Sequence, residues 1–508
     1  MIKDCGVFRS TKKIKNVAII GAGASGLITL YHLKKRNIKA TVYEQNSHVG
    51  GIWKINEKSP LYDELITNLP RQIMGFSEEF PFDSKLPSFI GHRDMCNYLH
   101  DFSVSNGLMG DINFNCNIVH VEKRQSSGVV NNPESQSEGA WTVQYRNRTA
   151  GDDPTDGCSK EHSDVLCERE HSAVVVCNGH FNHPISPIID GLEHFGGVLM
   201  HSARYRHADE LLEVSDNSGG VSGGDGLGAR YKYRQKRIVI VGAKSSATDI
   251  ARELAAVAGS VHVSDRNCVA SYSYAGTDGA VLHSSPGLDG RGGSAFHYHP
   301  GISHVDLAGR VVCTDGCVIT ADIIIFCTGY EYEFPFFPTV ERNGAAVVAV
   351  ENRSVRQLFQ HLYCLCDPTL AFVGLNHTII PFPVFNYQAM HIAAAFDEWC
   401  VGDSDSALLP SLKEREAALK QQEEALVPGG IHSTDPAAVR LLRNYHHLGG
   451  EQWDYMRMLV SQVHGSCTGA SEQRIRLMAA VYAMVSASRP PRVGLPDDYR
   501  KMELTVDP

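Results

Sequence analysis

Residues 16–44 carry the pattern that most restricts the fold of this chain. The apolar run 17–20 predicts a buried strand, and the glycine-rich turn 21–26 follows it at once. Apolar residues then recur at helical spacing, and a second strand over 40–43 ends at Glu44. A strand, a glycine turn, a helix, a strand and an acid in this order predict a unit that binds a dinucleotide.

Each glycine of this first turn has its own task. Gly21 permits the tight bend, Gly23 lets the backbone approach a diphosphate, and Gly26 lets the helix pack closely on the strand. The helix N-terminus then faces the phosphates, and Glu44 can accept hydrogen bonds from a ribose. The candidate cofactor-binding residues of this unit are Gly21, Ala22, Gly23, Ala24, Ser25, Gly26 and Glu44.

A second, less regular copy of the pattern runs from 237 to 266. Lys244 stands where the middle glycine is expected, and two hydroxyl residues follow it. Arg266 can pair the 2′-phosphate that NADP carries and NAD lacks, whereas a carboxylate at Asp265 suits a free 2′-hydroxyl. The candidate residues of this unit are Gly242, Lys244, Ser245, Ser246, Ala247 and Arg266.

Two dinucleotide sites in one chain imply electron transfer from a nicotinamide to a flavin. No cysteine lies between Cys5 and Cys96, so this stretch lacks the redox cysteine pair that a disulfide reductase needs. The electrons are therefore expected to pass to oxygen or to an organic acceptor. A further apolar strand ends at Thr328 and Gly329, and it can return the chain to the nucleotide.

The charge and composition exclude several classes of function. With 47 Lys and Arg against 57 Asp and Glu, the net charge is −10, which argues against nucleic acid as a partner. No apolar stretch has the length of a signal peptide or a membrane span. The 14 cysteines are scattered without a CxxC pair, so neither disulfides nor a metal site is expected. We expect a cytoplasmic protein without a membrane span.

The segment 195–205 carries the most specific pattern in the chain. Phe195, Gly197, His201 and Tyr205 fit FxGxxxHxxx(F/Y), the identifying pattern of the flavin-containing monooxygenases, and the chain resembles that family over nearly its whole length. Baeyer–Villiger monooxygenases end the corresponding pattern with Trp, so Tyr205 favours the branch that oxygenates nitrogen or sulfur. His201 and Tyr205 themselves are expected to be packing or hinge residues.

Three other segments are similar to segments of this family. Residues 50–53 resemble its flavin-side loop, residues 62–70 its active-site segment, and residues 326–330 its linker between domains. The resemblance therefore adds a set of cofactor-binding candidates: Ile52, Trp53, Thr67, Asn68, Thr328 and Gly329.

The resemblance also implies the fold, an α/β protein with two Rossmann-like domains in which the NADP domain is inserted into a discontinuous FAD domain. The expected parts are 1–200 for the first part of the FAD domain, 201–320 for the NADP domain, and 321–508 for the second part of the FAD domain with C-terminal helices. Glycine- and serine-rich composition predicts a surface insertion at about 125–168 and a linker at 214–229. Residues 411–426 predict a charged surface helix.

The implied reaction is that of an N,N-dimethylaniline monooxygenase-like enzyme with FAD and NADPH as cofactors. NADPH reduces FAD, the reduced flavin captures O2 as a hydroperoxide, and an amine nitrogen or a thioether sulfur takes the distal oxygen. Asn68 is the expected catalytic residue, because an amide carries donors and an acceptor and does not titrate. The expected partners are a small nucleophilic substrate and O2, with a homodimer left open.

Three alternatives stay open from the sequence. One is an uncoupled NADPH oxidase that releases H2O2, and another is a monooxygenase of the Baeyer–Villiger type. The third is a non-enzymatic redox sensor that binds dinucleotides without turnover.

Overall fold

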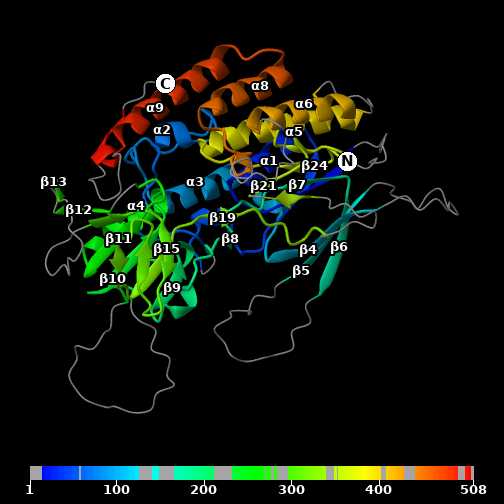
Figure 1. Ribbon diagram of the computed structural model, residues 1–508. Helices are drawn as coiled ribbons and strands as arrows, with labels where there is room; N and C mark the ends of the chain where they lie inside the picture. The colour runs from blue at the N-terminus through cyan, green and yellow to red at the C-terminus, as the bar shows by residue number, and fades with distance from the viewer. Residues whose placement is uncertain are drawn as a thin grey trace, which may run out of the picture.

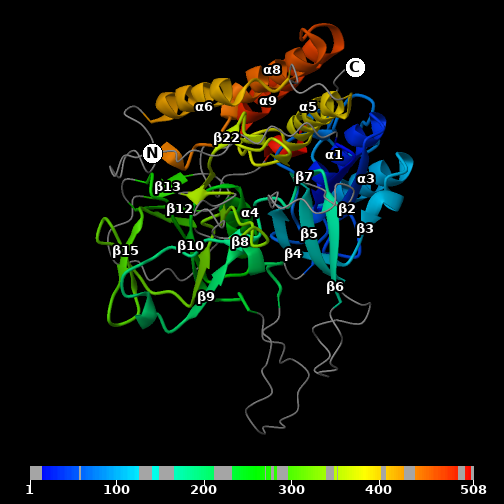
Figure 2. The ribbon, with the colours of Figure 1, turned by 90° about the vertical axis from the view of Figure 1, so that its right-hand side faces the viewer.

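Two seven-stranded sheets organise the chain (Figure 1). The computed structural model describes residues 14–56, 59–124, 140–147, 165–210, 232–268, 271–275, 280–282, 296–338, 348–351, 353–401, 408–427, 441–489 and 498–504. In Figure 2 the second sheet (green) and the first sheet (blue) stand side by side, and a layer of helices runs above the first.

The central strands of the first sheet are parallel and buried on both faces. β1 (Asn16–Ile20) pairs in parallel with β2 (Lys39–Tyr43) and with β7 (Ala173–Val176). Val17 and Ile19 are both fully buried, as a central strand of a parallel sheet requires. The sheet order is β22-β23-β24-β7-β1-β2-β3, with β3 (Ile112–Asn113), β22 (Leu358–Phe359), β23 (Tyr363–Cys364) and β24 (Leu370–Phe372).

The second sheet repeats this arrangement. β10 (Arg237–Val241) lies in parallel between β11 (Ser260–Ser264) and β18 (Ile323–Phe326). Its order is β13-β12-β14-β11-β10-β18-β9, with β9 (Val198–His201), β12 (Tyr272–Ala275), β13 (Ala280–Leu282) and β14 (Phe296–His299). β9 and β18 lie at the expected domain boundaries near 200 and 320, and both belong to this sheet. The domain boundaries themselves stay a prediction.

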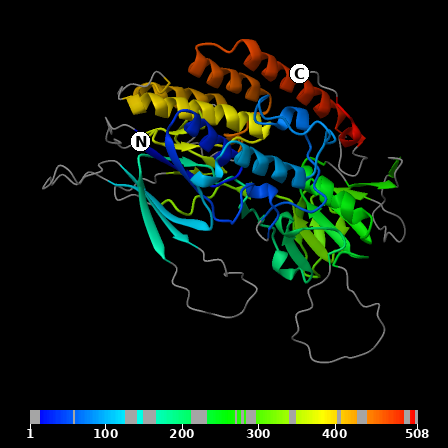
Figure 3. The same cartoon turned by 180° about the vertical axis from the view of Figure 1, so that it is seen from behind.

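Helices cover both sheets. α1 (Ala24–Lys35) follows β1 and packs on α5 (Pro381–Val401), which in turn packs on α8 (Gln452–His464). Figures 1 and 3 both show α5, α8 and α9 (Gly469–Ser488) layered above the first sheet. Other helices among the described residues are α2 (Arg71–Met74), α3 (His92–Ser105), α4 (Ser245–Ala255) and α6 (Leu412–Leu426).

Smaller sheets complete the fold. They are β4 (Cys116–Lys123) with β5 (Trp141–Asn147) and β6 (Leu166–His171), and β15 (Ile302–Val305) with β16 (Val311–Cys313) and β17 (Val318–Ile319). Two short antiparallel pairs are β8 (His183–Pro184) with β19 (Tyr330–Glu331), which are distant in the sequence, and β20 (Val350–Glu351) with β21 (Ser354–Val355).

The predicted charged helix is present as α6. Ser411 caps it by accepting a hydrogen bond from the Glu414 backbone, and the Glu414 side chain bonds back to Ser411, which forms a capping box. Most of the predicted insertion at 125–168 and all of the linker at 214–229 lie outside the described residues. Among the residues that are described, no helix is long and apolar enough to cross a membrane.

Candidate active site

The first turn needs glycine at two positions because of the protein backbone itself. Gly21 has a φ of +101°, and a Cβ there would lie 2.7 Å from the carbonyl oxygen of Cys177. A Cβ on Gly26 would lie 1.9 Å from the carbonyl oxygen of Gly21. These two residues let β1, β7 and α1 meet closely, as the sequence predicts.

Gly23 is under no such constraint. Its φ is −78°, which any residue adopts, and a Cβ there would meet only Gly51, with the Cα of Gly51 at 3.5 Å. It is the N-cap of α1, and no side chain caps this helix. Backbone that is left open at an uncapped helix N-terminus fits the diphosphate of FAD.

Glu44 is held at the mouth of the same turn. It is buried, and one carboxylate oxygen accepts a hydrogen bond from the Ala22 backbone at 2.7 Å. The other oxygen accepts from the backbone and side chain of Asn46, at 2.9 and 2.8 Å. The carboxylate is thereby fixed, and its remaining lone pairs can receive ribose hydroxyls.

The predicted flavin-side residues lie around this turn. The loop 50–53 forms the 3-10 helix η1 (Gly51–Trp53), and Trp53 meets Phe382 edge-on. Thr67 is buried and accepts a hydrogen bond from the Ile90 backbone at 3.1 Å, so its hydroxyl holds the active-site segment in place.

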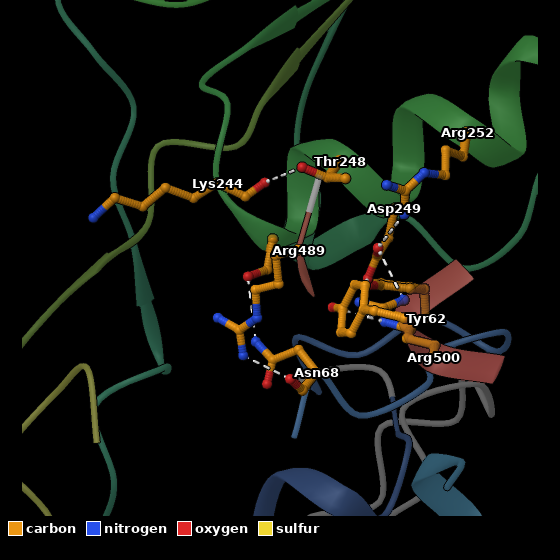
Figure 4. A network of polar contacts seen from close by, with 10 residues as sticks. Tyr62, Asn68, Lys244, Thr248, Asp249, Arg252, Arg489 and Arg500 are labelled. Atoms are coloured by element: carbon orange, nitrogen blue, oxygen red, sulfur yellow. Dashed lines mark hydrogen bonds and ion pairs between the residues drawn. The ribbon is translucent and has the colours of Figure 1, made fainter. Parts of the chain in front are cut away.

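The second turn has the same backbone as the first. Gly242 has a φ of +114°, and Lys244 has φ and ψ of −89° and −172°, against −78° and −172° at Gly23. A Cβ on Gly242 would lie 2.5 Å from the carbonyl oxygen of Cys327, which repeats the contact of Gly21. α4 also lacks a side-chain cap. This turn fits a second diphosphate, with the Lys244 side chain extending away from α4 (Figure 4).

The residues predicted to read the ribose, Asp265 and Arg266, stand after β11, at the same edge of the sheet. Asp265 turns one carboxylate oxygen back to accept from the Asn267 backbone at 3.0 Å. Arg266 is exposed, and its side chain passes close to Gly301. The carboxylate that would favour NAD is therefore engaged in its own turn.

Asn68 joins the two halves of the molecule. Its side-chain amide donates to the hydroxyl of Ser245 at 3.5 Å, and its backbone carbonyl accepts from the Arg489 guanidinium at 2.6 Å (Figure 4). Ser245 is the first residue of α4, and Arg489 follows α9. Asn68, the expected catalytic residue, thus lies where the predicted active-site segment 62–70 meets the second turn.

The comparisons with known proteins agree with this geometry. Residues 14–215 match the family model described as flavin-binding monooxygenase-like. The flavin-containing monooxygenase FMO GS-OX5 of Arabidopsis thaliana is 30% identical over 519 residues, covering 97% of this chain and 94% of that one. The chain belongs to the flavin-containing monooxygenase family.

Two solved structures show the same architecture. S-allyl-L-cysteine S-oxygenase from Allium sativum is 30% identical with a TM-score of 0.70, covering 96% of this chain and 95% of that one. Cyclohexanone monooxygenase is 13% identical with a TM-score of 0.54, over 89% and 97% of the two chains, and it shares the fold alone. These comparisons confirm the α/β fold with two Rossmann-like domains. They also confirm that the protein is an FAD-dependent monooxygenase of a family that uses FAD and NADPH.

In this flavin-containing monooxygenase, two residues of the identifying pattern make contacts between segments: His201 contacts the predicted linker 326–330, and Tyr205 contacts α4. His201 ends β9, and its imidazole lies 3.1 Å from the carbonyl oxygen of Gly329, at the end of β18. The Tyr205 hydroxyl donates to Glu253 on α4 at 2.6 Å, and burial raises the pKa of Glu253 to about 7. His201 is the last residue of an extended strand and only the 3-10 helix Ser202–Arg204 separates it from Tyr205, so the two residues share no α-helical face.

Sequence reasoning missed a cluster beside Asn68. Asp249 on α4 accepts from the Tyr62 hydroxyl at 2.5 Å and pairs with Arg500 at 3.1 Å. Burial raises the pKa of Tyr62, so the phenol stays protonated. Ser245 and Asp249 are one helical turn apart, and this spacing was the available signal that one face of α4 meets the segment 62–68.

Proposed function

We propose that the protein oxygenates a soft nucleophile at the expense of NADPH and O2, with a thioether sulfur as the favoured target. The observation that carries the proposal is the hydrogen bond from the Asn68 amide to Ser245, which puts this amide at the N-terminus of α4, directly after the second turn. The choice of sulfur is supported by the name of the Allium sativum relative, an S-oxygenase of an allyl cysteine.

When bound, FAD supplies the oxygen-activating group and NADPH supplies the hydride. In our proposal the first turn binds the FAD diphosphate, and Glu44 holds the ribose. The second turn binds the NADPH diphosphate through backbone N–H groups, with Lys244 at its side. Thr328 and Gly329 follow the neighbouring strand β18, which ends at Phe326, so they border the same edge.

Asn68 offers an amide N–H to the reacting oxygen, and this amide does not titrate. Its amide group can donate to an oxygen atom, and its side-chain oxygen can accept a second hydrogen bond. The Arg489 guanidinium fixes the backbone of this residue, so the amide does not have to be ordered during turnover. Buried Tyr62 and Tyr205 close the region behind α4 and keep water out.

We expect the purified protein to be yellow, with FAD that is released on denaturation. The reason is that the turn residues and Glu44 offer only non-covalent contacts to the cofactor. Oxidation of NADPH is then measured with a thioether, a tertiary amine and a ketone, with O2 uptake, product and H2O2 quantified in parallel. Sulfoxide formed in proportion to NADPH supports the proposal. H2O2 in that proportion instead would establish an oxidase, a ketone-derived ester would establish a Baeyer–Villiger enzyme, and a colourless protein would remove the flavin.

We expect NADPH to be preferred over NADH, and Arg266 to carry much of the preference. A charge-assisted contact to a phosphate contributes about 1.5–3 kcal/mol, or about ten- to a hundredfold in affinity. Arg266→Ala should therefore lower kcat/KM for NADPH far more than for NADH. Asp265 is the companion position: its carboxylate accepts from the Asn267 backbone, so Asp265→Thr should change kcat/KM little with either cofactor. Equal losses with both cofactors in the Arg266 variant would show that this side chain does not read the 2′-phosphate.

A further inference from the structure

A cavity of about 280 Å3 lies beside the second turn. Its lining residues are Ile185, Glu331, Val350, Arg353 and Arg443. The wall of the cavity contacts the segment that follows β18, since the backbone N–H of Ile185 donates a hydrogen bond to the Gly329 carbonyl at 3.0 Å. Gly242 approaches the residue just before Thr328 closely enough that a Cβ would clash with its carbonyl. The cavity therefore adjoins the edge where we place NADPH.

The charge in this cavity is unbalanced. Among the described residues, neither Arg353 nor Arg443 has an acidic partner within ion-pair distance. Glu331 is the one carboxylate on the wall. Burial is the largest cause that lowers the pKa of Arg353; the positive charges of Arg443 and Arg266 repel its cation and lower this pKa further, while the carboxylate of Glu331 partly offsets them. A bound anion would remove this repulsion.

Arg353 is also fixed in advance. Its φ of +64° lies in the left-handed region, which costs a non-glycine residue energy unless the surroundings hold it. Its guanidinium donates to the Thr328 carbonyl at 2.9 Å, so the arginine is tied to the end of β18 rather than extended into solvent. The donating nitrogen keeps a second N–H, which can act together with a neighbouring N–H of the guanidinium in a planar, bidentate contact with an oxyanion.

We propose that Arg353 and Arg443 form a binding site for a phosphate or carboxylate group of a ligand at the carboxyl edge of the second sheet. Two ligands of the proposed reaction offer such a group. One is NADPH, through its 2′-phosphate, and the other is an amino-acid-like thioether, through its carboxylate. The site thus deepens the proposed function, and it rests on that function only for the second source.

The first arm of the test uses binding without turnover. The FAD-loaded protein is titrated calorimetrically with 2′,5′-ADP and with 5′-AMP, which lacks the 2′-phosphate. If the cofactor phosphate is the source, Arg353→Met and Arg443→Met weaken 2′,5′-ADP by about ten- to a hundredfold and leave 5′-AMP unchanged. Arg443 is exposed, so its variant removes the charge without disturbing the core.

The second arm uses the substrate. KM is measured for S-methylcysteine and for its carboxamide, at saturating NADPH. If the substrate carboxylate is the source, the same two variants raise KM for the acid about tenfold or more and leave the amide unchanged. Arg310→Met is the control, because Arg310 is exposed beyond β15 and pairs with Asp306, and it removes the same charge elsewhere.

The two arms separate the outcomes. A selective loss in either arm supports the site and identifies its ligand. Unchanged values in both arms, or losses that Arg310→Met reproduces, would overturn it. A protein that oxidises NADPH without making sulfoxide would contradict the proposed function, whereas the titration with 2′,5′-ADP would still report on the arginines.

Discussion

Asn68→Ala is expected to retain reduction of the flavin by NADPH and to lower product formation by about a hundredfold or more, the usual loss for one preorganised hydrogen-bond donor at a reacting oxygen. The hydride comes from the nicotinamide, so its transfer does not need this amide. The backbone carbonyl that accepts from Arg489 is kept in the alanine variant, so the segment should stay in place. Stopped-flow absorbance gives the reduction rate, and product and H2O2 are assayed under turnover.

The matched control for this variant is Asn106→Ala. Asn106 is also half-buried and donates to a backbone carbonyl at the end of α3, on an element that carries no candidate residue. It should leave both rates as in the parent protein. If Asn68→Ala formed product at the parent rate, Asn68 would have no part in the reaction.

Gly26→Ala is expected to unfold the first turn. The new methyl group would lie 1.9 Å from the carbonyl oxygen of Gly21, a backbone atom that cannot rotate away as the end of a flexible side chain could. Forced overpacking of this kind costs about 3 kcal/mol or more. Thermal unfolding of the apoprotein, followed by fluorescence, should shift down by several degrees, and the variant should carry no flavin.

Gly23→Ala is the companion variant, and it should behave in the opposite way. The methyl group would meet only Gly51, at an ordinary contact distance of 3.5 Å, so the apoprotein should unfold close to the parent temperature. Replacing glycine by alanine at a helix N-cap costs at most about 1 kcal/mol. Affinity for FAD should fall sharply, because the methyl group occupies the space that we assign to the diphosphate. Parent-like FAD binding would show that the diphosphate does not approach Gly23.

Both nucleotide turns could be predicted from the sequence because their signals are local. A buried strand, a bend that needs Gly21, and a helix follow one another within twenty residues, and β1, α1 and β2 are present where they were expected. The second turn was recognisable although Lys244 replaces the middle glycine. The fold tolerates this lysine because its φ of −89° is one that any residue can adopt. Short-range geometry of this kind is determined by the order of residue types along the chain.

The partners of Asn68 could not be predicted, for the opposite reason. Arg489 reaches its carbonyl from the end of α9, and Arg500 reaches Asp249 from the 3-10 helix η6 (Asp498–Lys501). No periodicity or motif marks these arginines, because their positions depend on how the helical layer packs over the first sheet. The cavity at Arg353 is also non-local, since its walls come from β8, β19, β20 and the segment before α8.

The shared backbone of the two turns has a consequence for the effect of salt. One copy places glycine where the other places Lys244, so the diphosphate at the first turn faces peptide dipoles, and the diphosphate at the second turn also faces the exposed cation of Lys244. Dipoles in close contact are little affected by dissolved ions, whereas exposed charges are screened over about 10 Å at 0.1 M ionic strength. If the assignments hold, the resident flavin stays bound over a wide range of ionic strength, while capture of the reductant weakens as salt is added. Ionic strength would then change how often NADPH reduces the enzyme, without changing the reaction that the reduced enzyme carries out.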